Sequence, residues 1–180
     1  MNKEFVITQD GSYTIYLREM DEHYHSTHGA IQESMHIYIN EGLFQFSGRR
    51  ISILEIGFGT GLNAFLTCIY ARKNNICVDY YSIEKYPLTE PEYKSLNYAS
   101  GEFEEYASVF EKLHSADWNI DFVVDSNFKL HKIHADLTTY QFDLPAKVDL
   151  VYYDAFAPNK QPDLWTDEVI SKVSNCVGKD

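Results

Sequence analysis

Residues 51–63 read ISILEIGFGTGLN, a run of strand-forming apolar residues that leads into three glycines within five positions. Glycine has no Cβ, so it allows the backbone to turn sharply and lets a ligand come close to the main chain. The residues after Gly61 are typical of a helix, whose first N–H groups and positive dipole end would face such a ligand. The segment therefore predicts a strand, a tight turn and a helix, with a binding site at the turn.

The spacing of the glycines narrows the kind of ligand. Gly57, Gly59 and Gly61 alternate with larger residues, and an acidic residue, Glu55, lies two positions before the first glycine. A dinucleotide-binding fingerprint has a small residue three positions after its second glycine, where this chain has Leu62. The pattern therefore favours S-adenosylmethionine over NAD or FAD.

Composition sets wider bounds. The chain has 180 residues, of which 44% are hydrophobic and 15% aromatic, which fits one packed globular domain. Its net charge of −12 argues against tight, nonspecific nucleic-acid binding, although a local basic patch would still permit RNA. No stretch approaches the length of a membrane span, and the polar start is unlike a signal peptide. The three cysteines are widely spaced and fit ordinary thiols in a cytoplasmic protein.

Apolar periodicity and turn residues predict alternating strands and helices. Residues 5–17 alternate around Asp10-Gly11, which predicts an N-terminal hairpin. Further strands are expected at 51–56, 78–83, 122–124, 128–134 and 148–153. Helices are expected over 28–43, from about 61, from a capping box at Thr89 to about 98, over 102–113 and after Thr166, which can cap the last one. This order predicts an α/β fold with a mainly parallel sheet. We expect a single domain over 1–180, with a hairpin and helix in 1–48 and the core in 49–180.

Acidic residues follow three of the predicted strands. In open α/β sheets, ligands bind beyond the carboxyl ends of the strands. Glu84 lies 23 residues after Gly61, where an acid can accept hydrogen bonds from both hydroxyls of a ribose, or else is a solvated loop acid. Asp136 would read an adenine edge or serve as a plain turn residue. Asp154 faces the expected place of a methyl donor's sulfonium, or else caps the turn after its strand.

Three histidines lie close together in the N-terminal part of the chain, at positions 23, 25 and 28. No cysteine or acidic residue lies near them at the spacing of a metal site. We therefore interpret them as surface or loop residues and predict no bound metal.

Three stretches carry a resemblance to a known family: EIGFGTGLN at 55–63, SIEKYPLT at 82–89 and DAFAPNKQPDLWT at 154–166. They are similar to the methyltransferase domain of the bifunctional enzyme that completes 5-methylaminomethyl-2-thiouridine at the wobble position of tRNA. The third stretch is long and specific, and the resemblance spans essentially the whole chain. It implies a class I, Rossmann-like methyltransferase fold, S-adenosylmethionine as methyl donor and an aminomethyl-uridine in tRNA as acceptor.

The resemblance also implies roles for individual residues. Asp154 would orient the acceptor amine or take its proton, and Phe156 would stack on the uridine. Pro158 and Lys160 join Phe156 as expected substrate-binding residues. The residues expected to bind the donor are Glu55, Gly57, Gly59, Gly61, Asn63, Glu84, Lys85, Asp136 and Asp154.

Two departures from the family pattern bear on these expectations. The flavin-dependent oxidoreductase domain of the bifunctional enzyme is not in this chain, and the sequence stops at Asp180, where the family continues with further strands. We therefore expect a C-terminally truncated methyltransferase whose strand at 148–153 is left as an open edge, which favours self-association. Two alternatives stay open: a methyl- or aminopropyl-transferase acting on a small amine, and an inactive fragment or non-catalytic binding protein.

Overall fold

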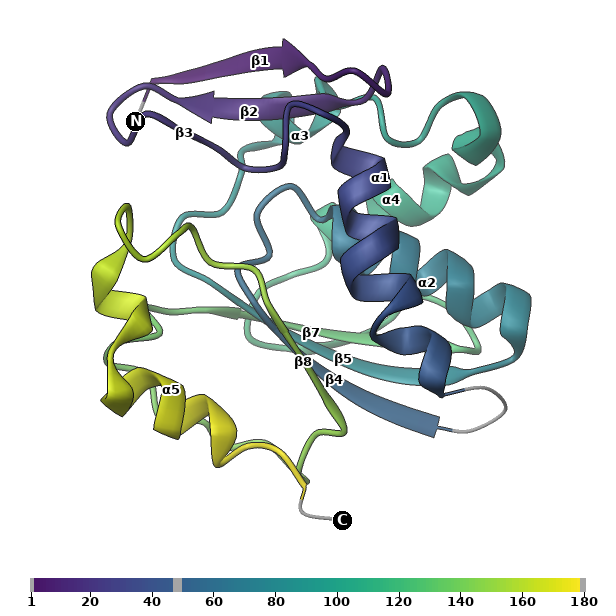
Figure 1. The fold of residues 1–180 in the computed structure, drawn as a ribbon. Coiled ribbons are helices and arrows are strands. Elements are labelled where there is room, and N and C mark those ends of the chain that lie inside the picture. The colour runs from purple at the N-terminus through teal and green to yellow at the C-terminus, as the bar shows by residue number, and fades with distance from the viewer. Residues whose placement is uncertain (1, 47–49, 179–180) are drawn as a thin grey trace.

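The central sheet has five strands in the order β6-β7-β5-β4-β8 (Figure 1). The computed structural model describes residues 2–46 and 50–178. The strands are β4 (Arg50–Ile56), β5 (Cys77–Glu84), β6 (Asp121–Val123), β7 (Phe128–His134) and β8 (Leu150–Tyr153). All neighbours pair in parallel except β6 and β7. The predicted α/β class and mainly parallel sheet are confirmed, and the strand order reverses between β4 and β8.

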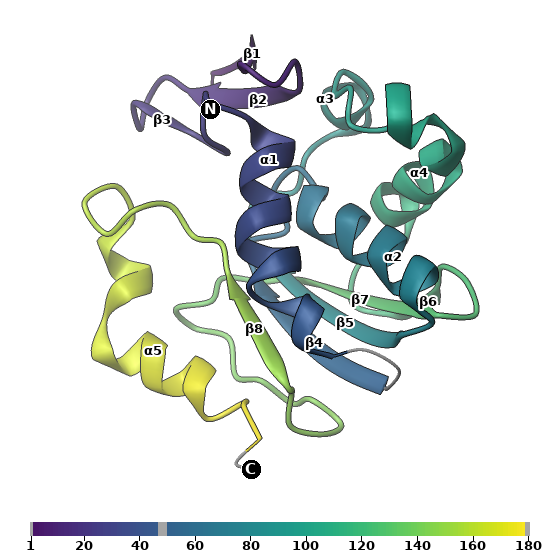
Figure 2. The ribbon, with the colours of Figure 1, turned by 45° about the vertical axis from the view of Figure 1, so that its right-hand side comes forward.

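Helices cover both faces of this sheet (Figure 2). One face carries α1, α2 and α4, and the other carries α5. The α-helices are α1 (Ala30–Ser34), α2 (Leu62–Asn74), α3 (Glu90–Lys94), α4 (Ala107–Ser115) and α5 (Asp167–Ser174). The π-helical turn is η1 (Met35–Asn40), and the 3₁₀ turns are η2 (Leu43–Gln45), η3 (Gly101–Tyr106) and η4 (Pro162–Trp165). No helix in the described ranges is long and apolar enough to cross a bilayer.

The side chains of β4 explain why the sheet is covered on both faces. Successive residues of a strand point to opposite faces. Ile51 and Ile53 pack with the α1, α2 and α4 side, whereas Leu54 and Ile56 pack with the residues around α5. All four side chains are buried. A strand that is apolar on both faces must lie inside the sheet, and this places the glycine turn after β4 near the centre of the molecule.

The predicted N-terminal hairpin is confirmed as β1 (Lys3–Ile7) paired with β2 (Tyr13–Leu17). A third short strand, β3 (Glu22–His23), joins β2 and was not predicted, because two residues give no periodic pattern. The side chain of Asn97 fixes this sheet to the rest of the molecule by accepting from the N–H of Tyr13 and donating to the carbonyl of Gly11, both at 2.8 Å.

Three predicted helices differ in detail from the structure. The helix expected over 28–43 is α-helical only to Ser34 and continues as the π-helical turn η1. The helix after Thr89 has the expected capping box but ends at Lys94, because the following residues instead hold the hairpin through Asn97. The first half of the segment 102–113 is the 3₁₀ turn η3.

The start of the predicted strand at 148–153 is paired with the C-terminal residues described by the structure. Val148 forms a parallel bridge with Val177, and the strand β8 begins only at Leu150. Beyond that bridge, β8 is the end strand of the sheet in the described part of the chain.

Thr166 caps the N-terminus of α5, as the sequence predicts, because its hydroxyl accepts a hydrogen bond from the N–H of Val169 at 3.3 Å. We expect Thr166→Ala to lower the free energy of unfolding by about 1 kcal/mol. Ser171→Ala is the matched control, since Ser171 is exposed in the same helix and alanine is a good helix former. Urea denaturation followed by circular dichroism measures both variants, and an equal loss in the two would contradict the capping role.

Candidate active site

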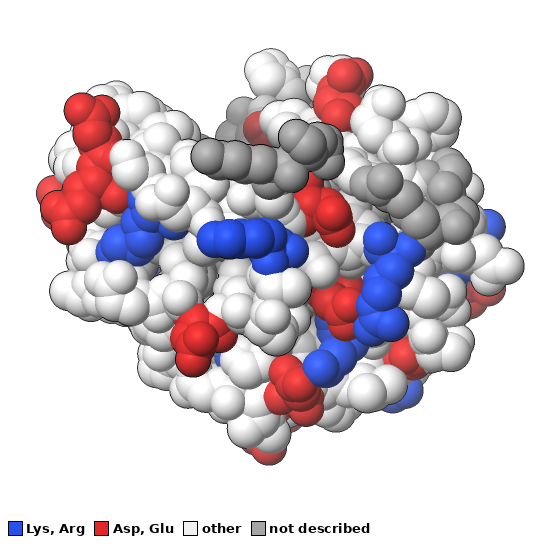
Figure 3. Space-filling model, turned by 90° about the horizontal axis from the view of Figure 1, so that it is seen from below, with Lys and Arg blue, Asp and Glu red and all other residues white. Residues whose placement is uncertain are grey.

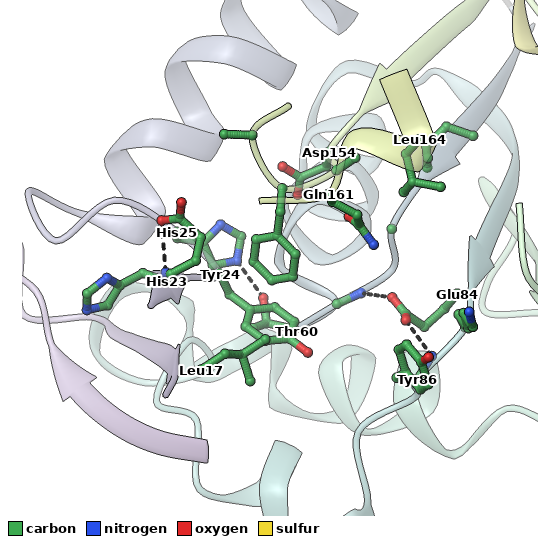
Figure 4. A pocket seen from close by; sticks show the side chains of 18 of the residues that line it. Leu17, His23, Tyr24, His25, Thr60, Glu84, Tyr86, Asp154, Gln161 and Leu164 are labelled. Atoms are coloured by element: carbon green, nitrogen blue, oxygen red, sulfur yellow. Dashed lines mark hydrogen bonds between the residues drawn. The ribbon is translucent and has the colours of Figure 1, made fainter. Parts of the chain in front are cut away.

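A cavity of about 830 Å³ lies at the carboxyl ends of β4, β5, β7 and β8, beneath the N-terminal sheet (Figure 4). It adjoins the point between β4 and β8 at which the strand order reverses, where ligands of open α/β sheets bind. Glu84 and Tyr86 lie on one side of the cavity, and His25 and Thr60 lie on another (Figure 4). Asp154 and Gln161 come from the segment after β8.

The glycines after β4 have positive φ angles of +91° at Gly57, +51° at Gly59 and +71° at Gly61. A Cβ at Gly57 would lie 2.7 Å from the carbonyl oxygen of Asp154, and one at Gly61 would lie 2.8 Å from Nε2 of His114. Both the backbone path and the close packing therefore require glycine. Gly57 and Gly59 line the cavity, whereas Gly61 is the N-cap residue of α2.

Two histidines hold the residue at the top of this turn. Nε2 of His25 lies 2.6 Å from Oγ1 of Thr60, and Nε2 of His114 lies 3.1 Å from the Thr60 carbonyl oxygen. The His114 ring also stacks on Tyr93 at a centroid distance of 4.3 Å. Because a carbonyl only accepts, the Nε2 of His114 carries the proton in this hydrogen bond.

Both histidines are neutral at physiological pH. Burial lowers the pKa of His25 to about 4 and that of His114 to about 3. His25 lies in a loop, as predicted, but it is not a surface residue, since its side chain is buried against the glycine turn. Thr60, its partner, lies 35 positions away, so local sequence gave no signal of the contact.

Glu84 joins the end of β5 to the glycine turn. Its two carboxylate oxygens accept from the N–H of Gly59 at 3.0 Å and from the N–H of Tyr86 at 2.7 Å (Figure 4). Each oxygen retains acceptor capacity, and the residue lines the cavity. Glu84 is therefore a fixed acceptor beside the turn, as the prediction of a ribose-binding acid requires.

Lys85 and Asp136 also line the cavity, and they form an ion pair at 2.7 Å. The other oxygen of Asp136 accepts from the N–H of Thr138 at 2.9 Å and from its hydroxyl at 2.7 Å. The hydrogen bond from Lys85, followed by those from Thr138, lowers the pKa of Asp136 to about 2. These contacts favour the turn-forming alternative for the Asp136 carboxylate.

Asp154 is held from two sides. The hydroxyl of Tyr38 donates to Oδ1 at 2.7 Å, and Nδ2 of Asn63 donates to Oδ2 at 2.8 Å. Burial raises the pKa of Asp154 to about 6, against the effect of these two hydrogen bonds. Both Asp154 and Tyr38 line the cavity. The sequence analysis missed Tyr38, which lies on η1 and is separated from Asp154 by 116 positions.

The remaining predicted residues lie in different places. Phe156 lines the cavity and packs edge-on against Tyr24 at 5.3 Å, whereas Pro158 is exposed and does not line it. Lys160 donates to the carbonyls of Met20 at 3.0 Å and Asp21 at 2.8 Å, so it fastens the segment after β8 to the N-terminal sheet. Glu55 is fully buried under the turn and does not line the cavity. The binding roles of Glu55, Pro158 and Lys160 stay predictions.

The cavity fits an adenosine-containing methyl donor. It has room for such a molecule, its glycine turn brings bare backbone to the wall, and Glu84 offers carboxylate oxygens to hydroxyl groups. Glu84 would hold the ribose, and Gly57 and Gly59 would form the wall against which the donor lies.

Comparisons with known proteins identify the type of domain. Residues 98–180 match the family model described as S-adenosyl-L-methionine-dependent methyltransferase. The chain is 30% identical over 166 residues to the tRNA 5-methylaminomethyl-2-thiouridine biosynthesis bifunctional protein MnmC of Campylobacter fetus, covering 89% of this chain and 27% of that protein. It is 29% identical over 171 residues to the protein of the same name from Leptospira borgpetersenii, covering 86% of this chain and 26% of that protein.

A solved structure extends the similarity to the fold. The crystal structure of MNMC2 from Aquifex aeolicus superposes with a TM-score of 0.81 at 28% sequence identity. The superposition covers 98% of this chain and 57% of that one. The chain thus spans about a quarter of the curated relatives that it matches and just over half of this solved structure.

The buried, neutral state of His25 predicts a pH dependence of stability. The pKa of His25 falls from 6.5 to about 4 on folding, so between these values the unfolded chain binds more protons. Stability from this residue is therefore fully present above pH 6.5 and is lost as the pH falls toward 4, by about 3 kcal/mol. We expect the advantage of the wild type over His25→Gln to shrink over this range.

The matched control is His28→Gln, because His28 is exposed. Urea denaturation at several pH values measures the free energy of unfolding of all three proteins, and the contributions of other groups cancel in the differences. A difference between wild type and His25→Gln that stays constant with pH would contradict the neutral, buried state of His25.

Proposed function

Because this chain is a member of the MnmC-like methyltransferase family, we propose that it transfers a methyl group from S-adenosylmethionine to a tRNA. The acceptor is the aminomethyl nitrogen of 5-aminomethyl-2-thiouridine at the wobble position. The observation that carries this proposal is the Asp154 carboxyl group, held by Tyr38 and Asn63 at the wall of the cavity. The names of the relatives support the nucleoside, and the matching family model supports the methyl donor.

S-adenosylmethionine supplies a methyl group on a positively charged sulfur, which is open to in-line attack by an amine. Positioning is then the main task of the protein. Glu84 accepts hydrogen bonds from hydroxyl groups, and its contact with Gly59 fixes the distance between that acceptor and the turn. The two histidines hold Thr60 so that the turn keeps its shape.

Asp154 acts on the acceptor amine, which is an ammonium ion in water at neutral pH and must lose a proton before it attacks. With a pKa of about 6, the Asp154 carboxyl is ionised at neutral pH and weakly basic. It orients the amine and accepts its proton, directly or through water. Tyr38 and Asn63 donate to one oxygen each, which fixes the carboxylate plane.

The charge of the cavity wall suits cationic ligands. A single lysine, Lys85, lies among its lining residues. The acidic residues that line it are Glu22, Glu33, Glu84, Asp136, Asp154 and Asp163. This excess of acids favours an ammonium group and a sulfonium group over anions. Phe156, beside Asp154, offers a ring on which a uracil base can stack.

The negatively charged tRNA backbone requires a basic surface, whereas the cavity wall is acidic. On the face opposite the N-terminal sheet, Lys and Arg side chains lie next to Asp and Glu side chains (Figure 3). The described residues form no continuous basic area on that face (Figure 3), and we propose that the tRNA approaches the rim of the cavity instead. A tRNA substrate also places the protein in the cytoplasm.

The free edge of β8 offers a place for contact between two copies of the chain. Of the described strands, β8 lies at one edge of the sheet. On its outer side, a bridge to Val177 pairs only Val148, which comes just before the strand. We propose that the free edge pairs with a second copy at high concentration, because unpaired N–H and C=O groups invite another strand. Size-exclusion chromatography across a concentration series tests this, and a constant monomeric elution volume would contradict it.

Replacing Asp154 by asparagine keeps the shape but removes the charge and the basicity. We expect Asp154→Asn to lower single-turnover methylation of tRNA that carries 5-aminomethyl-2-thiouridine by about 10²–10⁴-fold. Binding of S-adenosylhomocysteine should persist. The wild-type rate should rise as the pH increases through about 6, because the carboxylate form is the active one. Mass spectrometry of the digested nucleosides measures the product.

The control for this prediction is Asp167→Asn, since Asp167 is exposed in α5 and does not line the cavity. An unchanged rate in Asp154→Asn would make Asp154 a structural turn residue. Methylation of a free small amine, with no reaction on the tRNA, would favour the small-molecule alternative.

Glu84 is predicted to set the affinity for the donor. Glu84→Gln removes the charge and leaves one oxygen in place of two, so we expect S-adenosylhomocysteine to bind about 1.5–3 kcal/mol more weakly. NADH should bind neither protein. Isothermal titration calorimetry measures both affinities. Glu104→Gln is the control, because Glu104 is exposed in η3, and equal affinities for wild type and Glu84→Gln would remove Glu84 from the site.

A further inference from the structure

Three oxygen atoms under the glycine turn are buried and lack a hydrogen-bond partner of normal geometry among the described residues. They are Oε1 of Glu55, Oδ1 of Asn63 and the hydroxyl of Tyr80. Their side chains are 0%, 2% and 1% exposed, so water does not reach them from outside. Buried polar atoms of native proteins are nearly always paired, so a group of three calls for a common explanation.

These atoms belong to one cluster. Glu55 lies on β4, Tyr80 on the neighbouring strand β5 and Asn63 in the first turn of α2. The side chains of Tyr80 and Asn63 both lie close enough to the Glu55 carboxyl group to influence it, and each lowers its pKa. Oε2 of Glu55 is already satisfied, because the hydroxyl of Ser82 donates to it at 2.6 Å.

Among the described residues, the groups that act on the Glu55 carboxyl include no cation. They are Ser82, Tyr80, Asn63 and the acidic Asp154. A buried carboxylate with no positive partner is strongly disfavoured, and a second acid nearby disfavours it further. Burial is the largest cause and raises the pKa of Glu55 well above its usual value, against the hydrogen bond from Ser82 and the smaller effects of Tyr80 and Asn63, while Asp154 raises it further.

The number of hydrogen-bond donors and acceptors distinguishes the ionised form of Glu55 from the protonated form. An ionised Glu55 accepts from the hydroxyl of Tyr80, but it leaves Oδ1 of Asn63 with no donor. A protonated Glu55 donates its O–H to Oδ1 of Asn63, and its remaining lone pair accepts from Tyr80. Only the protonated form gives all three atoms a partner.

We propose that Glu55 is a neutral carboxylic acid in the folded protein and that its O–H fixes the orientation of the Asn63 amide. The Asn63 oxygen then faces Glu55, and its NH₂ group faces Oδ2 of Asp154, to which it donates at 2.8 Å. Glu55 is thus a positioning residue for Asp154 and not a direct ligand of the methyl donor. Its importance for turnover rests on the proposed function, whereas its protonation does not.

The orientation of the amide matters because its two ends have opposite effects on Asp154. The NH₂ group stabilises the carboxylate, whereas a reversed amide would place an oxygen against it and favour the protonated form. The other titratable groups packed around the cluster are the phenols of Tyr38, Tyr80 and Tyr152, and burial raises the pKa of each. These phenols stay neutral, so the proton on Glu55 is the one that determines the orientation of the Asn63 amide.

Infrared spectroscopy tests the protonation state without turnover. At pH 8 in D₂O, Asp154 is ionised, and we expect the wild type to show the C=O stretching band of a buried carboxylic acid. Glu55→Gln should abolish the band, and Asp154→Asn should retain it as a control. A wild type without this band, or a band that survives in Glu55→Gln, would overturn the proposal.

The effect on Asp154 is measured by carbon NMR titration of its carboxyl group, assigned with Asp154→Asn. Glutamine at position 55 still donates to Asn63, so Glu55→Gln should keep the midpoint near that of the wild type. Glu55→Leu has no donor, and we expect its midpoint to rise by about one pH unit. Equal midpoints in all three proteins, or a rise in Glu55→Gln as large as in Glu55→Leu, would contradict the positioning role.

Should Glu55→Leu fail to fold, the infrared comparison of wild type and Glu55→Gln decides the proposal alone. Failure of tRNA methylation with these spectroscopic results intact would refute the proposed function and leave the inference about Glu55 standing.

Discussion

The carboxyl group of Asp154 joins three segments that are far apart in the sequence. Tyr38 reaches it from the N-terminal helical region, Asn63 reaches it from the helix after the glycine turn, and Asp154 itself follows β8. The backbone takes part as well, because the carbonyl of Asp154 lies where a side chain at Gly57 would be. The shape of the cavity depends on this meeting of chain segments, since displacing any of them would open its wall.

Two buried groups favour the same working range of pH by independent routes. His25 stabilises the turn only while it is neutral, and its pKa is about 4 in the folded protein. Asp154 accepts a proton only while it is ionised, and its pKa is about 6. The two groups affect stability in opposite directions. The lowered pKa of His25 makes the protein more stable as the pH rises, whereas the raised pKa of Asp154 makes it less stable as the pH rises from 3.8 to about 6. Above pH 6 the turn is stable and the carboxyl group of Asp154, which we propose is the base, is mostly ionised.

Local sequence was enough to predict the part of the fold that we propose binds the donor. The apolar run before Gly57, the alternating glycines and the following helix each obey a local rule, and the structure contains all three. The capping residues Thr89 and Thr166 were predicted for the same reason. By contrast, β3 and the π-helical turn η1 have no local pattern that distinguishes them.

The side chains that complete the site were harder to predict, because they act across long separations. Tyr38 and His25 lie in segments that read as an ordinary helix and a loop, and only the folded chain brings them to Asp154 and Thr60. Lys160 was predicted as a substrate ligand, yet its ammonium group is bonded to main-chain carbonyls of the N-terminal sheet. Burial of an acid such as Glu55 is likewise a property of the packed molecule and not of its sequence neighbours.

The central claim is that the cavity holds the methyl donor in one direction, with its reactive end at Asp154. A crystal structure of the protein with S-adenosylhomocysteine tests this directly. The account predicts that the ribose hydroxyls contact Glu84 and that the sulfur faces the Asp154 carboxyl, with the bare backbone of Gly57 and Gly59 along the ligand. A ligand in the opposite direction, with its sulfur beside the Lys85–Asp136 pair, or a ligand bound outside this cavity, would contradict it.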